Sequence, residues 1–212
     1  VISSAVVVSF VNYLYLYLIT SRFLSTGFAG IIAAAVAFTP YVVLSVIHFR
    51  PDNFMLAAFF AGLYYYFCHI KEQKLWQLVL AFVLFWCSFM FLQKIVFTLL
   101  VIATVTLYLL CTRQLRWENV LYAALLPLLL SLVFAAYMYQ NDILSVWYHS
   151  NFTFNLHIPR LFDERRIGYF WPELKLLLVG SACALVFCLK NANIYFKIIT
   201  LIFVSELCQR LF

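Results

Sequence analysis

Long apolar runs separated by short polar connections make up most of this chain. The longest run covers residues 75–112, 38 residues in which Lys94 is the only charged side chain and lies close to the middle. A helix crosses the hydrocarbon core of a bilayer with about 20 apolar residues, so this run is too long for one span and suited to two. A lysine in the middle of one long helix would be stranded in lipid, at a cost of about 3 kcal/mol. The pattern therefore predicts a helical hairpin with Lys94 at its turn, at one surface of the membrane.

The rest of the chain follows the same pattern, which predicts an all-α fold, a polytopic transmembrane helical bundle of about eight spans. The predicted spans are residues 2–20, 28–48, 53–69, 75–93, 95–112, 119–139, 174–190 and 194–212. We expect transmembrane helices with short loops over 1–139, one longer outer loop over the polar stretch 140–173, and further transmembrane helices over 174–212. Both ends of the sequence fall inside apolar runs, so we expect a fragment of a longer protein.

Composition agrees with a protein integral to the membrane. Hydrophobic residues make up 67% of the chain and charged residues 10%, whereas a soluble domain carries about 25% charged residues. The net charge of +6 is spread over the loops. This spread predicts contact with anionic lipid headgroups and excludes nucleic acid as a partner, because no basic cluster suited to a groove is present.

The sequence lacks the short motifs of several enzyme classes. It contains no Walker loop, no Gly-x-Ser-x-Gly and no His-Glu-x-x-His, so nucleotide hydrolysis and classical serine or zinc hydrolysis have no support. Six cysteines lie in or beside apolar runs without a Cys-x-x-Cys pair, as small buried hydrophobic residues do. We predict no metal-binding motif and no cofactor. Use of a divalent metal stays open.

Alternation of the spans sorts the connections onto two sides of the membrane. Side one holds Arg22, Lys71, Lys74, Arg113, Arg116, Lys190 and Lys197, and side two holds Arg50, Lys94, Arg160, Arg165, Arg166, Lys175 and Arg210. Seven basic residues on each side leave the orientation undecided by charge. Side two also carries Asp52 and the loop 140–173, so we expect any chemistry to take place there.

The segment from Arg50 to Asp52 joins two predicted spans. Pro51 has no backbone N–H and biases Arg50 away from helical geometry. Asp52 is then placed to cap the next helix, where a carboxylate is favoured by free N–H groups and the helix dipole. The functional alternative is that Arg50 binds a phosphate with both arms of its guanidinium and Asp52 orients it. The sequence leaves both interpretations open.

Gln93 and Lys94 form the second candidate. A lysine at a hairpin turn can extend its ammonium to the membrane surface simply to keep the charge in water, without any role in catalysis. It can also supply a cation to a lipid-linked phosphate, with Gln93 in support. The presence of Arg50 on the same predicted side favours this second role.

The outer loop supplies the third candidate. His149, His157 and Arg160 lie in a stretch where aromatic and polar residues alternate, which suits a sugar or acceptor surface. The two histidines are eight positions apart, which is not a metal-ligand spacing. The charge run 163–166 is typical of a solvated surface.

An Arg-x-Asp at the start of one span, a basic turn, and a lysine at the next turn on the Arg-x-Asp side form a layout that resembles the GT-C glycosyltransferases. The resemblance covers about residues 28–112. Within these enzymes the layout is most similar to the branch of protein mannosyltransferases and aminoarabinose transferases. Arg50 and Asp52 match its Arg-x-Asp, and Lys94 matches its lysine. The glycines that usually precede this lysine are absent, and neither Pro nor Gly follows it.

The resemblance implies a transferase that moves a sugar from a polyprenyl-phosphate donor to a lipid, glycan or protein acceptor. It implies that Arg50 and Lys94 bind the lipid phosphate on the outer face, either periplasmic in a bacterial inner membrane or lumenal. The family's catalytic acid lies in a first outer loop, which we expect to precede residue 1. No residue here is therefore assigned as the catalytic acid.

Three other classes of membrane protein remain as alternatives. A polysaccharide polymerase or ligase also has many spans and a large outer loop with arginines and a histidine. A transporter or lipid flippase would place charges in the middle of its spans, and such charges are almost absent here. A membrane subunit with a purely structural role is also compatible with the sequence.

Overall fold

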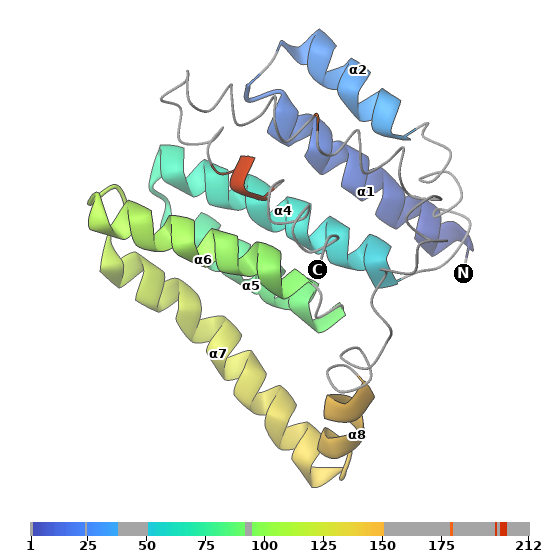
Figure 1. Cartoon of the computed structure of the whole chain (residues 1–212), viewed down its shortest axis with the longest axis vertical. Helices are drawn as coiled ribbons and strands as arrows, with labels where there is room; N and C mark the ends of the chain where they lie inside the picture. The colour runs from blue at the N-terminus through green and yellow to red at the C-terminus, as the bar shows by residue number, and fades with distance from the viewer. Residues whose placement is uncertain are drawn as a thin grey trace. The chain divides into compact units, whose positions relative to one another are not determined.

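The computed structural model describes residues 2–23, 25–37, 51–91 and 95–150, with positions 179, 198 and 200–202. Every element in this part of the chain is a helix, which confirms the all-α class. Figure 1 labels the helices as α1 (Ile2–Thr20), α2 (Thr26–Ala37), α4 (Pro51–Glu72), α5 (Leu75–Phe91), α6 (Val96–Cys111), α7 (Trp117–Gln140) and α8 (Leu144–Tyr148).

The chain divides into two compact units. The first unit contains Val1–Ile95 and Gln114–Ala135, so it includes α1, α2, α4, α5 and most of α7. The second unit contains Val96–Arg113 and Ala136–Phe212, so it includes α6, the end of α7 and α8. In the first unit α4 packs against both α1 and α5, and α2 packs against α1.

Two described helices are long and apolar enough to cross a membrane, Asn53–Glu72 within α4 and Trp117–Gln140, which is α7. The apolar helices Val6–Thr20, Leu75–Phe91 and Val96–Cys111 are shorter. The predicted total of about eight spans therefore stays a prediction. The run 75–112 does divide into two helices, because α5 ends at Phe91 and α6 begins at Val96.

Several boundaries differ from those expected. α4 continues to Glu72, although the hydropathy pattern placed residues 69–72 in a connection. α8 lies within the start of the predicted loop 140–173, where no helix was expected. α7 contains Pro127 in its interior, within the predicted span 119–139, and membrane helices tolerate such a proline.

Aromatic side chains and one glycine join α4 to α5. The Phe85 ring of α5 lies 5.7 Å from the ring of Phe59 and 6.3 Å from that of Tyr66, both on α4. Gly62 leaves the space that this ring occupies, because a Cβ at position 62 would lie 2.8 Å from Phe85 Cδ1. Small residues let membrane helices approach closely in this way.

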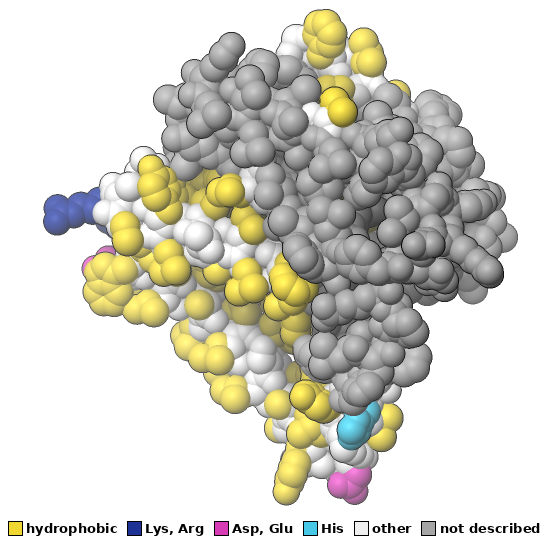
Figure 2. Space-filling view, in the orientation of Figure 1, with side chains coloured by type: hydrophobic (Ala, Val, Ile, Leu, Met, Phe, Trp, Pro, Cys, Tyr) yellow, Lys and Arg dark blue, Asp and Glu magenta, His cyan; other side chains and the backbone are white. Residues whose placement is uncertain are grey.

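α7 presents large apolar side chains outward along its length. Leu121, Leu128 and Val133 are each more than half exposed, at 59%, 57% and 68%. Figure 2 shows hydrophobic side chains spread over the described part of the face in view, with a basic side chain at one edge. Large exposed apolar surfaces are unusual on soluble monomers and normal where a helix faces lipid.

Candidate functional site

Most of the predicted site residues lie outside the described part of the chain. These residues are Arg50, Gln93, Lys94, His157 and Arg160. The structure therefore leaves the predicted grouping of Arg50 with Lys94 untested.

Asp52 and His149 are the two predicted site residues that lie in described helical backbone. α4 already includes Pro51 and Asp52, so Asp52 belongs to the first turn and does not hold the capping position that the sequence suggested. A carboxylate in a first turn is still favoured by the helix dipole. His149 follows α8 directly and is exposed, with its ring edge-to-face at 6.1 Å from that of Tyr148.

Two buried hydrogen bonds hold the start of α4. The Asn12 amide of α1 donates from Nδ2 to the backbone oxygen of Asn53, at 3.1 Å. The Ser88 hydroxyl of α5 donates to the backbone oxygen of Met55, at 2.9 Å. Neither Asn12 nor Ser88 was a candidate in the sequence, because a single polar residue in an apolar helix does not reveal its partner. The helix that begins directly after Arg50 is thus tied to both of its neighbours.

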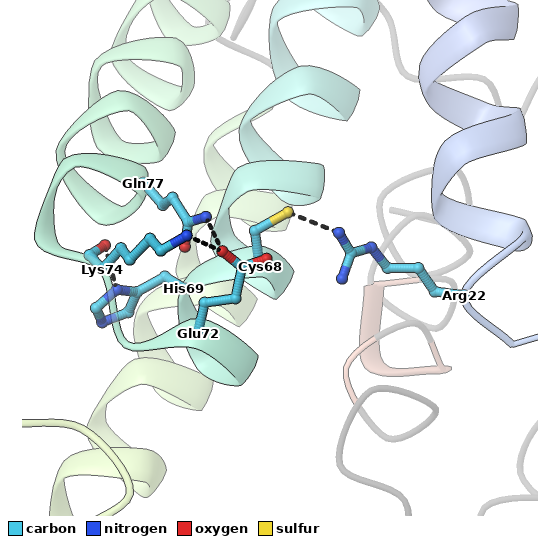
Figure 3. Close-up of polar contacts among 6 residues, drawn as sticks. All are labelled: Arg22, Cys68, His69, Glu72, Lys74 and Gln77. Carbon is cyan, nitrogen blue, oxygen red and sulfur yellow. Dashed lines mark hydrogen bonds and ion pairs between the residues drawn. The ribbon is translucent and has the colours of Figure 1, made fainter.

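A polar cluster that the sequence did not predict lies at the opposite end of α4 (Figure 3). The cluster consists of Arg22, Cys68, His69, Glu72, Lys74 and Gln77. Its residues Arg22 and Lys74 belong to side one, whereas we expected any chemistry on side two. The i, i+3 and i, i+5 spacing of polar residues across 69–77 is the one signal that could have indicated it.

Within the cluster, Glu72 and His69 fix the turn between α4 and α5. Glu72 Oε2 accepts from Gln77 Nε2 at 2.8 Å and pairs with Lys74 Nζ at 2.9 Å. His69 Nδ1 lies 2.8 Å from the backbone oxygen of Lys74 and must donate to it, because a carbonyl only accepts. Gln73 takes a left-handed conformation with φ of 56°, and its N–H donates to the His69 oxygen at 2.7 Å. This is the usual way of ending a helix with a single left-handed residue.

Arg22 connects the end of α1 to α4. Its guanidinium donates to Cys68 Sγ at 2.8 Å and lies over the Tyr64 ring, 4.9 Å from the centroid. Burial alone would lower the pKa of Arg22, but its hydrogen bond with Tyr64 and its proximity to Cys68 and Glu72 raise that pKa. Arg22 therefore stays charged, and the contact is a cation–π interaction combined with a hydrogen bond.

The chemistry available to this cluster is structural. Among the described residues no group of three or more His, Cys, Asp or Glu side chains could hold a metal ion. The contacts within the cluster pair charges and close a helical turn. Its position on side one separates it from the predicted site by the length of α4.

Comparison with known families decides what kind of protein carries this arrangement. A family model described as dolichyl-phosphate-mannose-protein mannosyltransferase matches residues 1–139. The chain belongs to this mannosyltransferase family. The match confirms the resemblance to GT-C glycosyltransferases and makes the chain a membrane glycosyltransferase. No curated protein and no solved structure matches the chain significantly.

The family match covers most of the described helices of this mannosyltransferase-family chain. Residues 1–139 include the Arg-x-Asp at 50–52 and Lys94, together with α1, α2, α4, α5, α6 and nearly all of α7. The family implies a polyprenyl-phosphate sugar donor and a glycan or protein acceptor in general terms. The sugar, the acceptor and the working face of the membrane belong to the proposal below.

Proposed function

We propose that this chain transfers a sugar from a polyprenyl-phosphate donor to a lipid, glycan or protein acceptor at the outer face of its membrane. The observation that carries the proposal is the family match over the segment that contains the Arg-x-Asp at 50–52 and the isolated Lys94. Arg50 and Lys94 bind the phosphate of the donor, Asp52 orients Arg50, and Gln93 supports Lys94.

The reaction gives these residues a clear electrostatic task. The acceptor hydroxyl attacks the anomeric carbon, the bond between that carbon and the phosphate oxygen breaks, and the phosphate leaves with the electron pair. A carboxylate takes the hydroxyl proton as a general base, and we assign this role to no residue between 1 and 212. Two fixed cations at the phosphate stabilise the negative charge that develops on the leaving group.

Fixed placement of Arg50 matters for this task. Arg50 directly precedes Pro51, the first residue of α4, and the first two turns of that helix accept the buried hydrogen bonds from Asn12 and Ser88. A helix start held from two sides supports a preorganised phosphate site, because little reorganisation is then needed as charge develops. The loop residues His149, His157 and Arg160 contribute to the sugar or acceptor surface.

The same proposal determines the face of the membrane at which sugar transfer takes place. Side two, which carries Arg50 and Lys94, is then periplasmic in a bacterial inner membrane or lumenal in an endoplasmic reticulum. Side one, with Arg22, Lys71 and Lys74, faces the cytoplasm. Labelling of single cysteines introduced at 71 and 94 in intact cells, in a background without native cysteines, tests this: a membrane-impermeant reagent should reach position 94 and not position 71.

Removal of the two cations tests the phosphate site. Arg50→Ala and Lys94→Ala should each lower transfer from a polyprenyl-phosphate sugar at least about a hundredfold, since lost transition-state contacts to charge cost about 3 kcal/mol. Lys71→Ala removes an equal charge from an exposed position on side one and is the matched control. All variants are compared at equal amounts of inserted full-length protein, with the polyprenyl-phosphate panel including mannose and aminoarabinose donors.

Lipid binding distinguishes a phosphate-binding role of Arg50 and Lys94 from a role that only keeps their charges in water. Native mass spectrometry with polyprenyl phosphate should show that the lipid is lost from Arg50→Ala and Lys94→Ala and kept by Lys71→Ala. If both variants at positions 50 and 94 keep full transfer and full lipid binding, the phosphate-site assignment is wrong.

A further inference from the structure

His69 is a titratable side chain that the sugar-transfer proposal does not use, and it is fully buried near the end of α4. Its ring closes the turn to α5, because Nδ1 donates to the backbone oxygen of Lys74 at 2.8 Å. The other ring nitrogen, Nε2, is also buried and has no hydrogen-bond partner in the described part of the chain. Figure 3 shows the ring with Nδ1 toward the Lys74 oxygen and Nε2 away from it. The closed turn therefore holds a neutral ring with its proton on Nδ1.

A second proton on this ring would have to be placed on Nε2. The charged ring would then be shielded from water, and its new N–H would meet no acceptor among the described residues. A buried charge is costly unless it is paired and hydrogen-bonded, and an unsatisfied buried donor is costly as well. The closed turn is therefore incompatible with a charged His69.

The charged groups near His69 do not offset this cost. Arg22, which follows α1, donates to the side chain that precedes His69, and Lys71 lies two residues further along α4. Lys74 precedes α5, and its ammonium is 2.9 Å from the one nearby carboxylate, that of Glu72. Three cations thus accompany a single carboxylate that is already paired. The tyrosines and cysteines of these helices are neutral near pH 6.

The segment before α7 also meets this turn. Gln73 Nε2 donates to the backbone oxygen of Gln114 at 3.3 Å. Arg113 and Arg116 flank this position and Glu118 follows in α7, and all three side chains are exposed. Exposed charges are screened by water, so this segment neither compensates a proton on His69 nor strongly opposes it.

We propose that His69 is an acid-sensitive latch on the turn between α4 and α5. While the ring is neutral, the hydrogen bond from Nδ1 to the Lys74 oxygen keeps the turn closed. In acid, the open turn takes up a proton from water at Nε2, and the charged ring then stays hydrated. The latch lies on side one and does not depend on the sugar transfer proposed for side two.

Proton binding sets the size and the sign of the effect. A hydrated histidine, as in the open turn, has a pKa of about 6.5. The closed turn holds the neutral ring, so the open turn binds one more proton below that pH, and the stability of the closed turn falls as the pH falls. The equilibrium constant for opening should therefore rise up to about tenfold between pH 7.5 and pH 5.5.

Hydrogen exchange of the full chain in lipid nanodiscs tests the latch. The exchange rate of the backbone N–H groups of residues 73–77 is compared between the wild-type protein and His69→Asn. Asparagine keeps a side-chain N–H that can donate to the Lys74 oxygen, but it cannot take up a proton. Comparison at one pH cancels the direct effect of acid on exchange and any titration of Glu72, which both proteins contain. The ratio of the wild-type rate to the variant rate should rise about tenfold from pH 7.5 to pH 5.5.

Two further variants serve as controls. His149→Asn changes the exposed histidine after α8 and should keep the pH dependence of the wild-type turn. His69→Phe can neither donate nor titrate, so its turn should exchange faster than the wild-type turn at pH 7.5, with no added increase in acid. The same pH dependence in His69→Asn as in the wild-type protein, or its loss in His149→Asn, would overturn the proposal. No sugar donor enters the assay, so failure of the transferase assignment would leave this result interpretable.

Discussion

Replacing Gly62 of α4 by alanine tests how closely α4 and α5 pack. A Cβ at this position would lie 2.8 Å from both Cδ1 and Cε1 of the Phe85 ring and 3.2 Å from the Ala81 backbone oxygen. Carbon atoms prefer a separation of about 3.5–4.0 Å, so the new methyl group would overlap the ring by close to 1 Å. Phe85 is 6% exposed and is packed against Phe59 and Tyr66, which limits how far the ring can move.

Two opposing terms set the size of the effect. Overpacking of a filled core costs about 1–3 kcal/mol, while alanine in place of glycine inside a helix gains about 1 kcal/mol. Gly62→Ala should therefore lower the free energy of unfolding by up to about 2 kcal/mol. Gly30→Ala on α2 is the matched control, because nothing lies within 4 Å of a Cβ at that position. Gly30→Ala should gain helix propensity without the steric overlap.

The measurement is equilibrium unfolding of the full chain in mixed micelles, with the three proteins compared at one detergent composition. The difference between the two alanine variants cancels the propensity term and should fall at about 1–3 kcal/mol, with Gly62→Ala the less stable. Combining Gly62→Ala with Phe85→Leu should recover part of the loss, since contacting sites are not additive. Equal shifts in Gly62→Ala and Gly30→Ala, or strict additivity in the double variant, would refute the packing argument.

Two further substitutions test the ends of α4. Ser88→Ala removes the buried hydrogen bond to the Met55 oxygen and should cost about 1 kcal/mol of unfolding free energy, and Ser88→Cys, which keeps a weak donor, should cost less. His69→Phe keeps a ring in a fully buried position but removes the donor to the Lys74 oxygen, and should cost about 1–3 kcal/mol in the same assay. Unchanged stability in either alanine or phenylalanine variant would show that the corresponding bond does not hold the helix.

The fold class and the division of the longest apolar run could be predicted because both depend on the length of apolar segments. One charge in the run 75–112 predicted two helices, and α5 and α6 are separate helices on either side of it. The end of α4 could not be predicted in the same way. Hydropathy falls at His69, but the helix continues because the His69 ring is buried and hydrogen-bonded, a gain that comes from packing and not from the sequence pattern.

The same distinction applies to the candidate site: some of its residues could be proposed from the sequence and others could not. Arg50 and Lys94 could be proposed because a charge at the edge of an apolar run has few roles, and their part in the site stays a prediction. Asn12 and Ser88 could not be named, because an amide or hydroxyl inside an apolar helix reveals its function only through its partner. Their partners are backbone oxygens on α4, which carry no side-chain signal at all.

These contacts give α4 a specific place in the molecule. The first two turns of α4 are tied to α1 and α5 by buried hydrogen bonds. Its last two turns are tied to Arg22, just after α1, and to α5 through the hydrogen bond of Glu72 with Gln77. A helix fixed at both ends cannot slide or rotate without breaking several bonds, each worth about 1 kcal/mol. In the function proposed above, Arg50 binds the donor phosphate and directly precedes this helix, so we expect the fixed helix start to help orient Arg50 before the donor arrives. We expect such preorganisation to lower the barrier of the proposed transfer, because the cation would not have to be repositioned as the phosphate leaves.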